Sequence, residues 1–167
     1  MLARPGTLKP SYMVDIAFSY LESCAKPMKN RTRVRFHTGT SEIMGNIILI
    51  DRETLDPGQN TVAQIRLDTP VVLVKDDRYV IRSYSPVRTI GGGRVLNPVP
   101  PKHKRFRAEV IESLGRYREM DPGEIIAFHA HQSGFQGTRF SDLRLVTNLP
   151  DKKLENGGLA LELVTTT

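Results

Sequence analysis

The chain has 167 residues, of which 39% are hydrophobic and 25% are charged, so it can bury a core and is not disordered by composition. Lysine and arginine number 24 against 18 aspartate and glutamate, and the resulting net charge of +6 permits a nucleic-acid partner without requiring one. The sequence has no apolar run long enough to span a membrane and no signal-peptide pattern at its start. The single cysteine, Cys24, excludes an internal disulfide framework, and we expect a cytoplasmic protein.

The first part of the chain reads as a series of short strands separated by turn signals such as Asp56-Pro57-Gly58 and Ser85-Pro86. The predicted strands cover residues 13–21, 32–37, 43–51, 61–68, 78–84 and 88–97. No helical pattern interrupts them, which indicates an antiparallel barrel or sandwich. A barrel would also protect such short strands from edge-to-edge pairing, because it has no free edges.

Basic side chains alternate along one of these segments, at Arg31, Arg33 and Arg35. Alternate residues of a strand share a face, so we expect the three guanidinium groups to line one side. Like charges on one face repel and need an anionic partner or acidic neighbours. The alternative is an ordinary solvated face, which is also the simpler interpretation of a second basic cluster at 102–107.

A proline-rich segment at 97–101 predicts a linker, since three of its last four residues are proline and favour an extended conformation. We expect it to hold the next domain at a semi-rigid distance.

After the linker, the apolar period changes to that of a helix, and a stripe from Phe106 to Tyr117 predicts the first one. Asp121-Pro122-Gly123-Glu124 is typical of a helix start, with Asp121 as the cap and Glu124 three residues on. A third helix is predicted over 138–149, and 151–164 reads as a helix or a strand. This order indicates a helix-turn-helix arrangement that stops before a complete winged helix.

Motifs for catalysis are missing from the sequence. There is no phosphate-binding P-loop, and Gly91-Gly92-Gly93 lies in a strand pattern, where glycines allow a bulge, a tight corner or close backbone approach. His129 and His131 are two residues apart and would point in different directions on a helix, so they cannot share a metal ion. Cys24 has no nearby histidine, and we expect a buried or idle thiol. We therefore expect no enzyme activity and no metal or cofactor in this segment.

Several strings resemble the SelB family, the selenocysteine-specific relatives of elongation factor Tu. They include Arg33-Val34-Arg35-Phe36-His37-Thr38-Gly39-Thr40, Arg82-Ser83-Tyr84-Ser85-Pro86 and, most specifically, Thr89-Ile90-Gly91-Gly92-Gly93-Arg94-Val95-Leu96-Asn97-Pro98. The resemblance covers nearly all of residues 2–98 and weakens after them.

The resemblance implies a domain layout. Residues 1–10 would connect from a preceding barrel, 11–98 would form a six-stranded antiparallel β-barrel equivalent to the third domain of elongation factor Tu, and 99–167 would form the linker and a partial winged-helix domain. In this family the third-domain barrel holds the T-stem backbone of aminoacyl-tRNA and docks on a GTPase domain, here absent together with its GTP and Mg²⁺. The winged-helix extension of the family reaches the mRNA hairpin that recodes UGA on the ribosome.

The resemblance also implies contact residues for selenocysteinyl-tRNA: Arg31, Arg33, Arg35, His37, Ser83, Tyr84 and Arg88. Met44 and Thr69 stand where elongation factor Tu has a threonine and a backbone-binding lysine, so its contacts do not copy over unchanged. An A-form stem is recognised through phosphates and 2′-hydroxyls, for which arginine is well suited. This mechanism requires the three arginines of the row to point outward and to be free of carboxylate pairs.

Two other functions fit the sequence. One is a regulator that binds DNA through a winged helix, although residues 151–162 carry two lysines against three acidic residues and so disfavour groove docking. The other is a docking module without RNA contact, in which the arginine row meets acidic residues of a protein partner.

Overall fold

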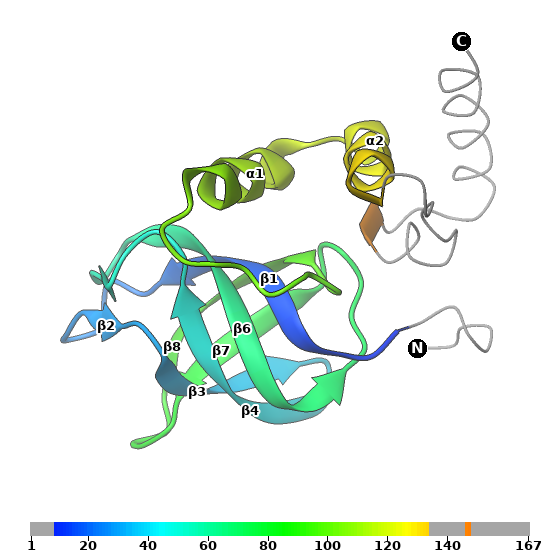
Figure 1. Cartoon of the computed structure of the whole chain (residues 1–167). Coiled ribbons are helices and arrows are strands. Elements are labelled where there is room, and N and C mark those ends of the chain that lie inside the picture. Colours follow the sequence, from blue (N-terminus) through cyan, green and yellow to red (C-terminus); the bar gives the residue numbers. More distant parts are fainter. Residues whose placement is uncertain (1–8, 134–145, 148–167) are drawn as a thin grey trace, which may run out of the picture.

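Six long antiparallel strands close into a barrel in the computed structural model, which describes residues 9–133 and 146–147 (Figure 1). The long strands are β1 (Ser11–Tyr20), β3 (Thr32–Thr38), β4 (Ser41–Leu49), β6 (Asn60–Val71), β7 (Arg78–Ser83) and β8 (Thr89–Asn97). They follow the order β1-β6-β4-β3-β7-β8. The six predicted strands and the barrel are confirmed. The two-residue strands β2 (Met28–Lys29) and β5 (Thr54–Leu55) were not predicted, because so short a segment has no readable period.

Strand alternation places one continuous core inside the barrel. Along β3, Val34 and Phe36 are fully buried, whereas the arginines on either side of Val34 face outward. Phe36 stacks on Tyr79 of β7 with ring centroids 5.2 Å apart. The outer side of the barrel is therefore free to carry polar and charged residues.

The glycines of β8 permit close approach between strands, as predicted. A Cβ at Gly93 would overlap the carbonyl oxygen of Ala17 on β1, and a Cβ at Gly91 would overlap the carbonyl oxygen of Ser19 and the ring of Phe18. Cys24 is buried, as expected, and its thiol donates to the Ile90 carbonyl oxygen at 3.6 Å.

The linker after β8 is fastened to the barrel instead of holding the next domain at a distance, so that expectation was wrong. We call residues 101–106 the strap. His103 Nε2 lies 2.7 Å from Asp15 Oδ2, and the Phe106 amide donates to the Ile50 carbonyl oxygen at 2.9 Å. Arg105 donates to two barrel carbonyl oxygens, those of Leu49 and Arg52, at 2.6 and 2.7 Å. The basic cluster thus divides: Lys102, Lys104 and Arg107 are exposed, whereas His103 and Arg105 are half-buried.

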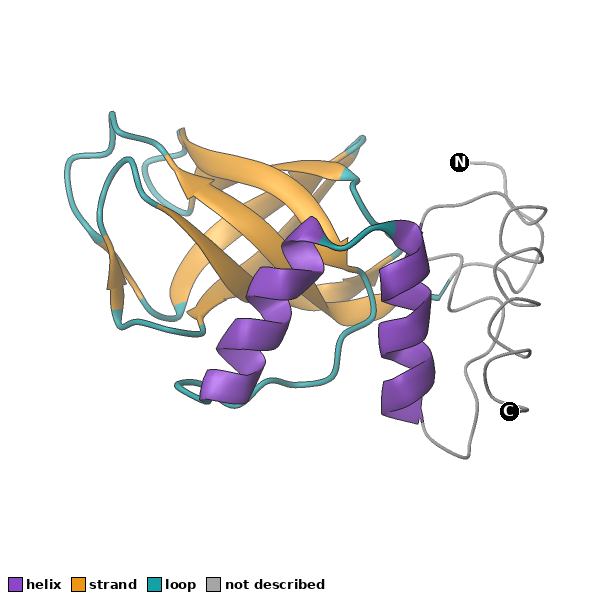
Figure 2. Cartoon of the chain, turned by 90° about the horizontal axis from the view of Figure 1, so that it is seen from above, coloured by secondary structure: helices purple, strands orange, loops and turns teal. Residues whose placement is uncertain are grey.

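Two helices follow the strap, α1 (Ala108–Glu119) and α2 (Pro122–Ser133), and both lie on the side of the barrel that the strap crosses (Figures 1 and 2). Leu114 of α1 packs with Ile48 and Ile50, and Tyr117 packs with Leu96 and with Ile125 of α2. The predicted helix start is confirmed, since the Glu124 amide donates to Asp121 Oδ1 and the Asp121 amide to Glu124 Oε2, both at 2.9 Å.

The helices predicted after residue 133, and the choice between helix and strand at 151–164, fall outside the described residues apart from the short helical piece at 146–147. Within the described residues, no helix is long and apolar enough to cross a membrane.

Candidate nucleic-acid interface

Four arginines from three strands come together on the outside of the barrel, on a surface we call the arginine face: Arg33 and Arg35 on β3, Arg66 on β6 and Arg82 on β7. Arg33 is opposite Asn46 of β4, which is opposite Arg66, so these three residues form one cross-strand row. Arg35 is opposite Arg82 in the next row.

Two of these arginines form ion pairs with carboxylates. Arg33 forms a two-pronged pair with Asp68 of β6, with its Nη1 donating to Oδ1 at 2.9 Å. Arg35 Nη1 donates to Glu42 Oε1 of β4 at 2.6 Å. Hydrogen bonding from the two arginines, together with their charge, lowers the pKa of Asp68 and of Glu42.

The predicted row of three free guanidinium groups is therefore wrong. Arg33 and Arg35 point outward, as predicted. Each is paired with a carboxylate, however, whereas the predicted mechanism requires guanidinium groups that are free of such pairs. Arg31 is not on the strand at all, because it precedes β3 with a left-handed backbone (φ 64°) and donates its amide to the Ile47 carbonyl oxygen. The acidic neighbours that crowded arginines need come from β4 and β6, and strand register cannot be read from one strand's sequence.

These pairs lie at the surface, with the Arg33 and Asp68 side chains 39% and 49% exposed. Exposed ion pairs are weak, because water solvates both partners and holding two long side chains costs entropy. The arginine face carries four guanidinium groups against two carboxylates, and Arg66 and Arg82 form no ion pair within the described part of the chain. The face keeps an excess of two positive charges.

The remaining predicted contact residues lie beside this face or just past its end. His37 Nε2 is 3.7 Å from Glu42 Oε2. The ring of Tyr84 is exposed and lies under the Arg35 guanidinium, 5.6 Å from its Cζ. Arg88 is exposed in the same loop as Tyr84.

Ser83, also a predicted contact residue, uses its hydroxyl within its own loop. Its hydroxyl donates to the Pro86 carbonyl oxygen and accepts from the Arg88 amide at 3.2 Å, so it closes the β7–β8 loop on itself. We assign Ser83 the role of shaping this loop, with its hydroxyl already in use.

Sequence reasoning missed Arg66 and Arg82 as members of the face. Arg66 stood in an alternating pattern and Arg82 in a quoted string, but only the register brings them beside Arg33 and Arg35.

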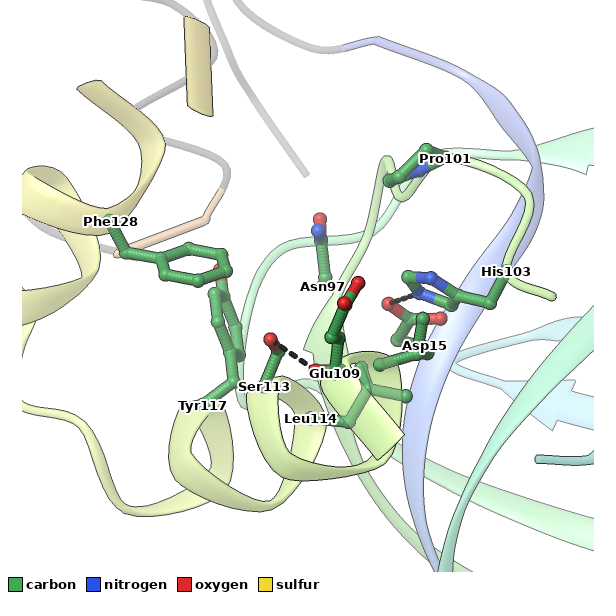
Figure 3. Close-up of a pocket in the computed structure, with 10 residues that line it drawn as sticks. Asp15, Asn97, Pro101, His103, Glu109, Ser113, Leu114, Tyr117 and Phe128 are labelled. Atoms are coloured by element: carbon green, nitrogen blue, oxygen red, sulfur yellow. Dashed lines mark hydrogen bonds and ion pairs between the residues drawn. The ribbon is translucent and has the colours of Figure 1, made fainter. Parts of the chain in front are cut away.

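A second polar cluster lies at the junction of barrel, strap and helices, around a cavity of about 320 Å³ (Figure 3). Asp15 is 1% exposed. Its carboxylate accepts a hydrogen bond from Gln64 Nε2 at 3.1 Å, in addition to its contact with the His103 ring. Burial raises the pKa of Asp15, and the hydrogen bonds from His103 and Gln64 oppose that rise. The Gln64 amide also donates to the Pro101 carbonyl oxygen at 2.9 Å. These hydrogen bonds fasten the strap to β1 and β6, so we assign the cluster a structural role.

No group of three or more potential metal ligands occurs among the described residues.

Comparison with known proteins agrees with this architecture. The family model described as "Selenocysteine-specific elongation factor, beta-barrel domain" matches residues 17–102, which is half of the chain and runs from the middle of β1 into the strap. The match and the closed barrel together show that the chain carries the barrel domain of a translation elongation factor.

Two curated relatives carry the same description. The selenocysteine-specific elongation factor of Desulfomicrobium baculatum is 35% identical over 93% of this chain, and that of Haemophilus influenzae is 32% identical over 47%. The chain belongs to the selenocysteine-specific elongation factor family. It spans 24% of the length of the first relative and 13% of the second.

Proposed function

We propose that this barrel binds the backbone of an A-form stem of selenocysteinyl-tRNA through its arginine face, as part of a selenocysteine-specific elongation factor. The observation that carries the proposal is the excess of guanidinium groups across β3, β6 and β7, beside the exposed Tyr84. Guanidinium groups bind phosphate oxygens bidentately, and the contacts with a stem go to its phosphates and 2′-hydroxyls.

Because two of the arginines are paired with carboxylates, we propose that RNA phosphates replace these carboxylates as partners of the guanidinium groups when the stem binds. A phosphate that approaches Arg33 or Arg35 competes with Asp68 or Glu42 for the same guanidinium. Both pairs are exposed and weak, so exchange costs little, while Arg66 and Arg82 attract the backbone without breaking a pair.

The wider role follows from the family. In it, the chain acts in the cytoplasm beside a GTPase domain that binds GTP and Mg²⁺, docks on that domain, and takes part in recoding UGA on the ribosome. The helices after the barrel begin the extension toward the mRNA hairpin.

The direct test is a salt titration of the 167-residue chain with a minihelix made of the acceptor and T stems of selenocysteine tRNA. We expect Arg33→Ala to weaken binding and to make the dependence of log K on log salt shallower by about 0.7–0.9 for one lost phosphate contact. Arg116→Ala is the matched control, because Arg116 on α1 also forms an exposed carboxylate pair, with Glu112, on the helical side.

Three results are informative. Unchanged affinity and slope in Arg33→Ala would remove Arg33 from the interface. Equal binding of duplex DNA would favour the DNA-binding alternative. Absence of minihelix binding by the unaltered chain would overturn the proposal and leave the docking module, with the arginine face meeting an acidic protein surface.

A further inference from the structure

A groove of about 480 Å³ lies between the segment that follows β1 and the β7–β8 loop. It is at the end of the barrel where residues 25–29, including β2, lie. Lys26 and Lys29 line one side, and Ser83, Ser85 and Arg88 line the other. Tyr20 and Ile90 also contribute to it. The groove thus brings together residues from distant parts of the sequence.

Hydrogen bonds hold both walls in place. On the first wall, Tyr20 Oη donates to the Lys26 carbonyl oxygen at 2.8 Å, and the Leu21 amide donates to the Ile90 carbonyl oxygen at 2.9 Å. On the second, Ser83 closes the β7–β8 loop, with its amide donating to the Arg88 carbonyl oxygen at 2.9 Å. The backbone that carries Lys26 and Arg88 is therefore preorganised.

The groove is positively charged and has no counter-charge of its own. No aspartate or glutamate lines it, and Lys26, Lys29 and Arg88 are exposed and form no ion pair within the described residues. On the arginine face, by contrast, carboxylates hold two of four cations.

The groove continues directly from the arginine face. Thr32 lines the groove and precedes Arg33, while Ser83 lines it and follows Arg82. Arg31, also exposed and unpaired among the described residues, lies next to Thr32. An RNA backbone that crosses β3 and β7 on the arginine face would therefore continue into the groove.

We infer that the groove is a second phosphate-binding site, which takes the backbone of the same RNA beyond the arginine face through Lys26, Lys29 and Arg88. The inference rests on the proposed function. Because its cations are uncompensated, the groove contributes more to affinity and to salt dependence than the carboxylate-paired arginines do. Its apolar lining residues, which include Pro27 and Ile90, suit the sugar faces between phosphates.

The test is the minihelix titration with Lys26→Glu/Lys29→Glu in the 167-residue chain. We expect an affinity loss of about tenfold or more at low salt and a salt slope shallower by about 1.4–1.8 for two lost phosphate contacts. Lys102→Glu/Lys104→Glu is the matched control, since both lysines are exposed and lie on the strap, away from the groove. Thermal unfolding of both double variants should match that of the unaltered chain, because no ion pair is lost.

The outcomes separate the two proposals. If the unaltered chain binds the minihelix and the groove variant keeps its affinity and slope, the groove inference fails and the arginine face stands. If groove and strap variants lose affinity equally, the effect is one of net charge and the inference also fails. If the unaltered chain does not bind, the proposed function fails first. Loss confined to the groove variant, with Arg88→Gln giving a smaller loss, supports the inference.

Discussion

The two sides of the barrel use their charged residues in opposite ways. On the side crossed by the strap and the helices, Asp15 is buried and its carboxylate is bonded by both His103 and Gln64. On the arginine face, the four guanidinium groups lie at the surface on half-buried side chains; carboxylates pair with Arg33 and Arg35, and Arg66 and Arg82 form no ion pair among the described residues. A buried charge must be matched to be tolerated, whereas an exposed one can wait for a ligand. Stability should therefore depend on the first side and binding on the second.

The largest expected effect is on the covered side, in His103→Ala. Removing the imidazole leaves the Asp15 carboxylate buried with Gln64 as its only remaining side-chain partner among the described residues, and we expect the free energy of unfolding to fall by about 2–3 kcal/mol. Chemical denaturation at neutral pH measures the loss. A loss no larger than that of an exposed-site substitution such as Lys104→Ala would contradict the role assigned to the pair.

The same variant has a predictable pH dependence. Burial raises the pKa of Asp15 in the folded state above its unfolded value, so its stabilising contribution is complete at acid pH and is lost as pH rises through the raised value. Without His103 that pKa rises further. The stability gap between the unaltered chain and His103→Ala should therefore be small at acid pH and widen toward neutrality. In an Asp15→Asn background the gap should no longer vary with pH.

A smaller loss is expected from Arg105→Ala, which removes two hydrogen bonds to barrel carbonyl oxygens and the 2.9 Å pair with Glu53. We expect about 1–3 kcal/mol by chemical denaturation. Arg105→Lys should recover little, since one ammonium cannot reproduce the planar, forked geometry. Full recovery by lysine would mean that charge alone matters there.

How much of this could be predicted differs between the two sides. The six strands followed from period and turn signals, and the α2 start followed from Asp121 and Glu124, because these are local patterns. The strap could not be predicted, since its proline content indicates an extended chain and says nothing of the barrel groups that receive it. His103 and Arg105 were hidden in a run of basic residues that reads as a solvated face.

The candidate site shows the same limit. Alternation on β3 predicted the outward direction of Arg33 and Arg35 correctly. It could not reveal Asp68 and Glu42, which come from other strands through the register. Nor could it show that Arg31 leaves the strand in a left-handed turn.

A local effect is expected at the start of α2. Asp121→Ala removes the acceptor for the Glu124 amide, and we expect a loss of about 1 kcal/mol. Faster hydrogen exchange of the Glu124 amide should accompany it, with the barrel amides unchanged. Faster exchange of the barrel amides as well would contradict this prediction, because it would show that the start of α2 and the barrel open together.

The smallest effect on stability, and the sharpest contrast between the two sides, is expected from Asp68→Asn. The Arg33–Asp68 pair is exposed, so thermal unfolding should hardly change. The substitution frees the Arg33 guanidinium, and minihelix binding should tighten, because a phosphate no longer competes with a carboxylate. Glu112→Gln on α1 breaks an equally exposed pair away from the arginine face and should leave binding unchanged. If Asp68→Asn weakened binding instead, the carboxylate would be positioning Arg33 for its ligand, and the exchange mechanism would be wrong even though the arginine face stayed the interface.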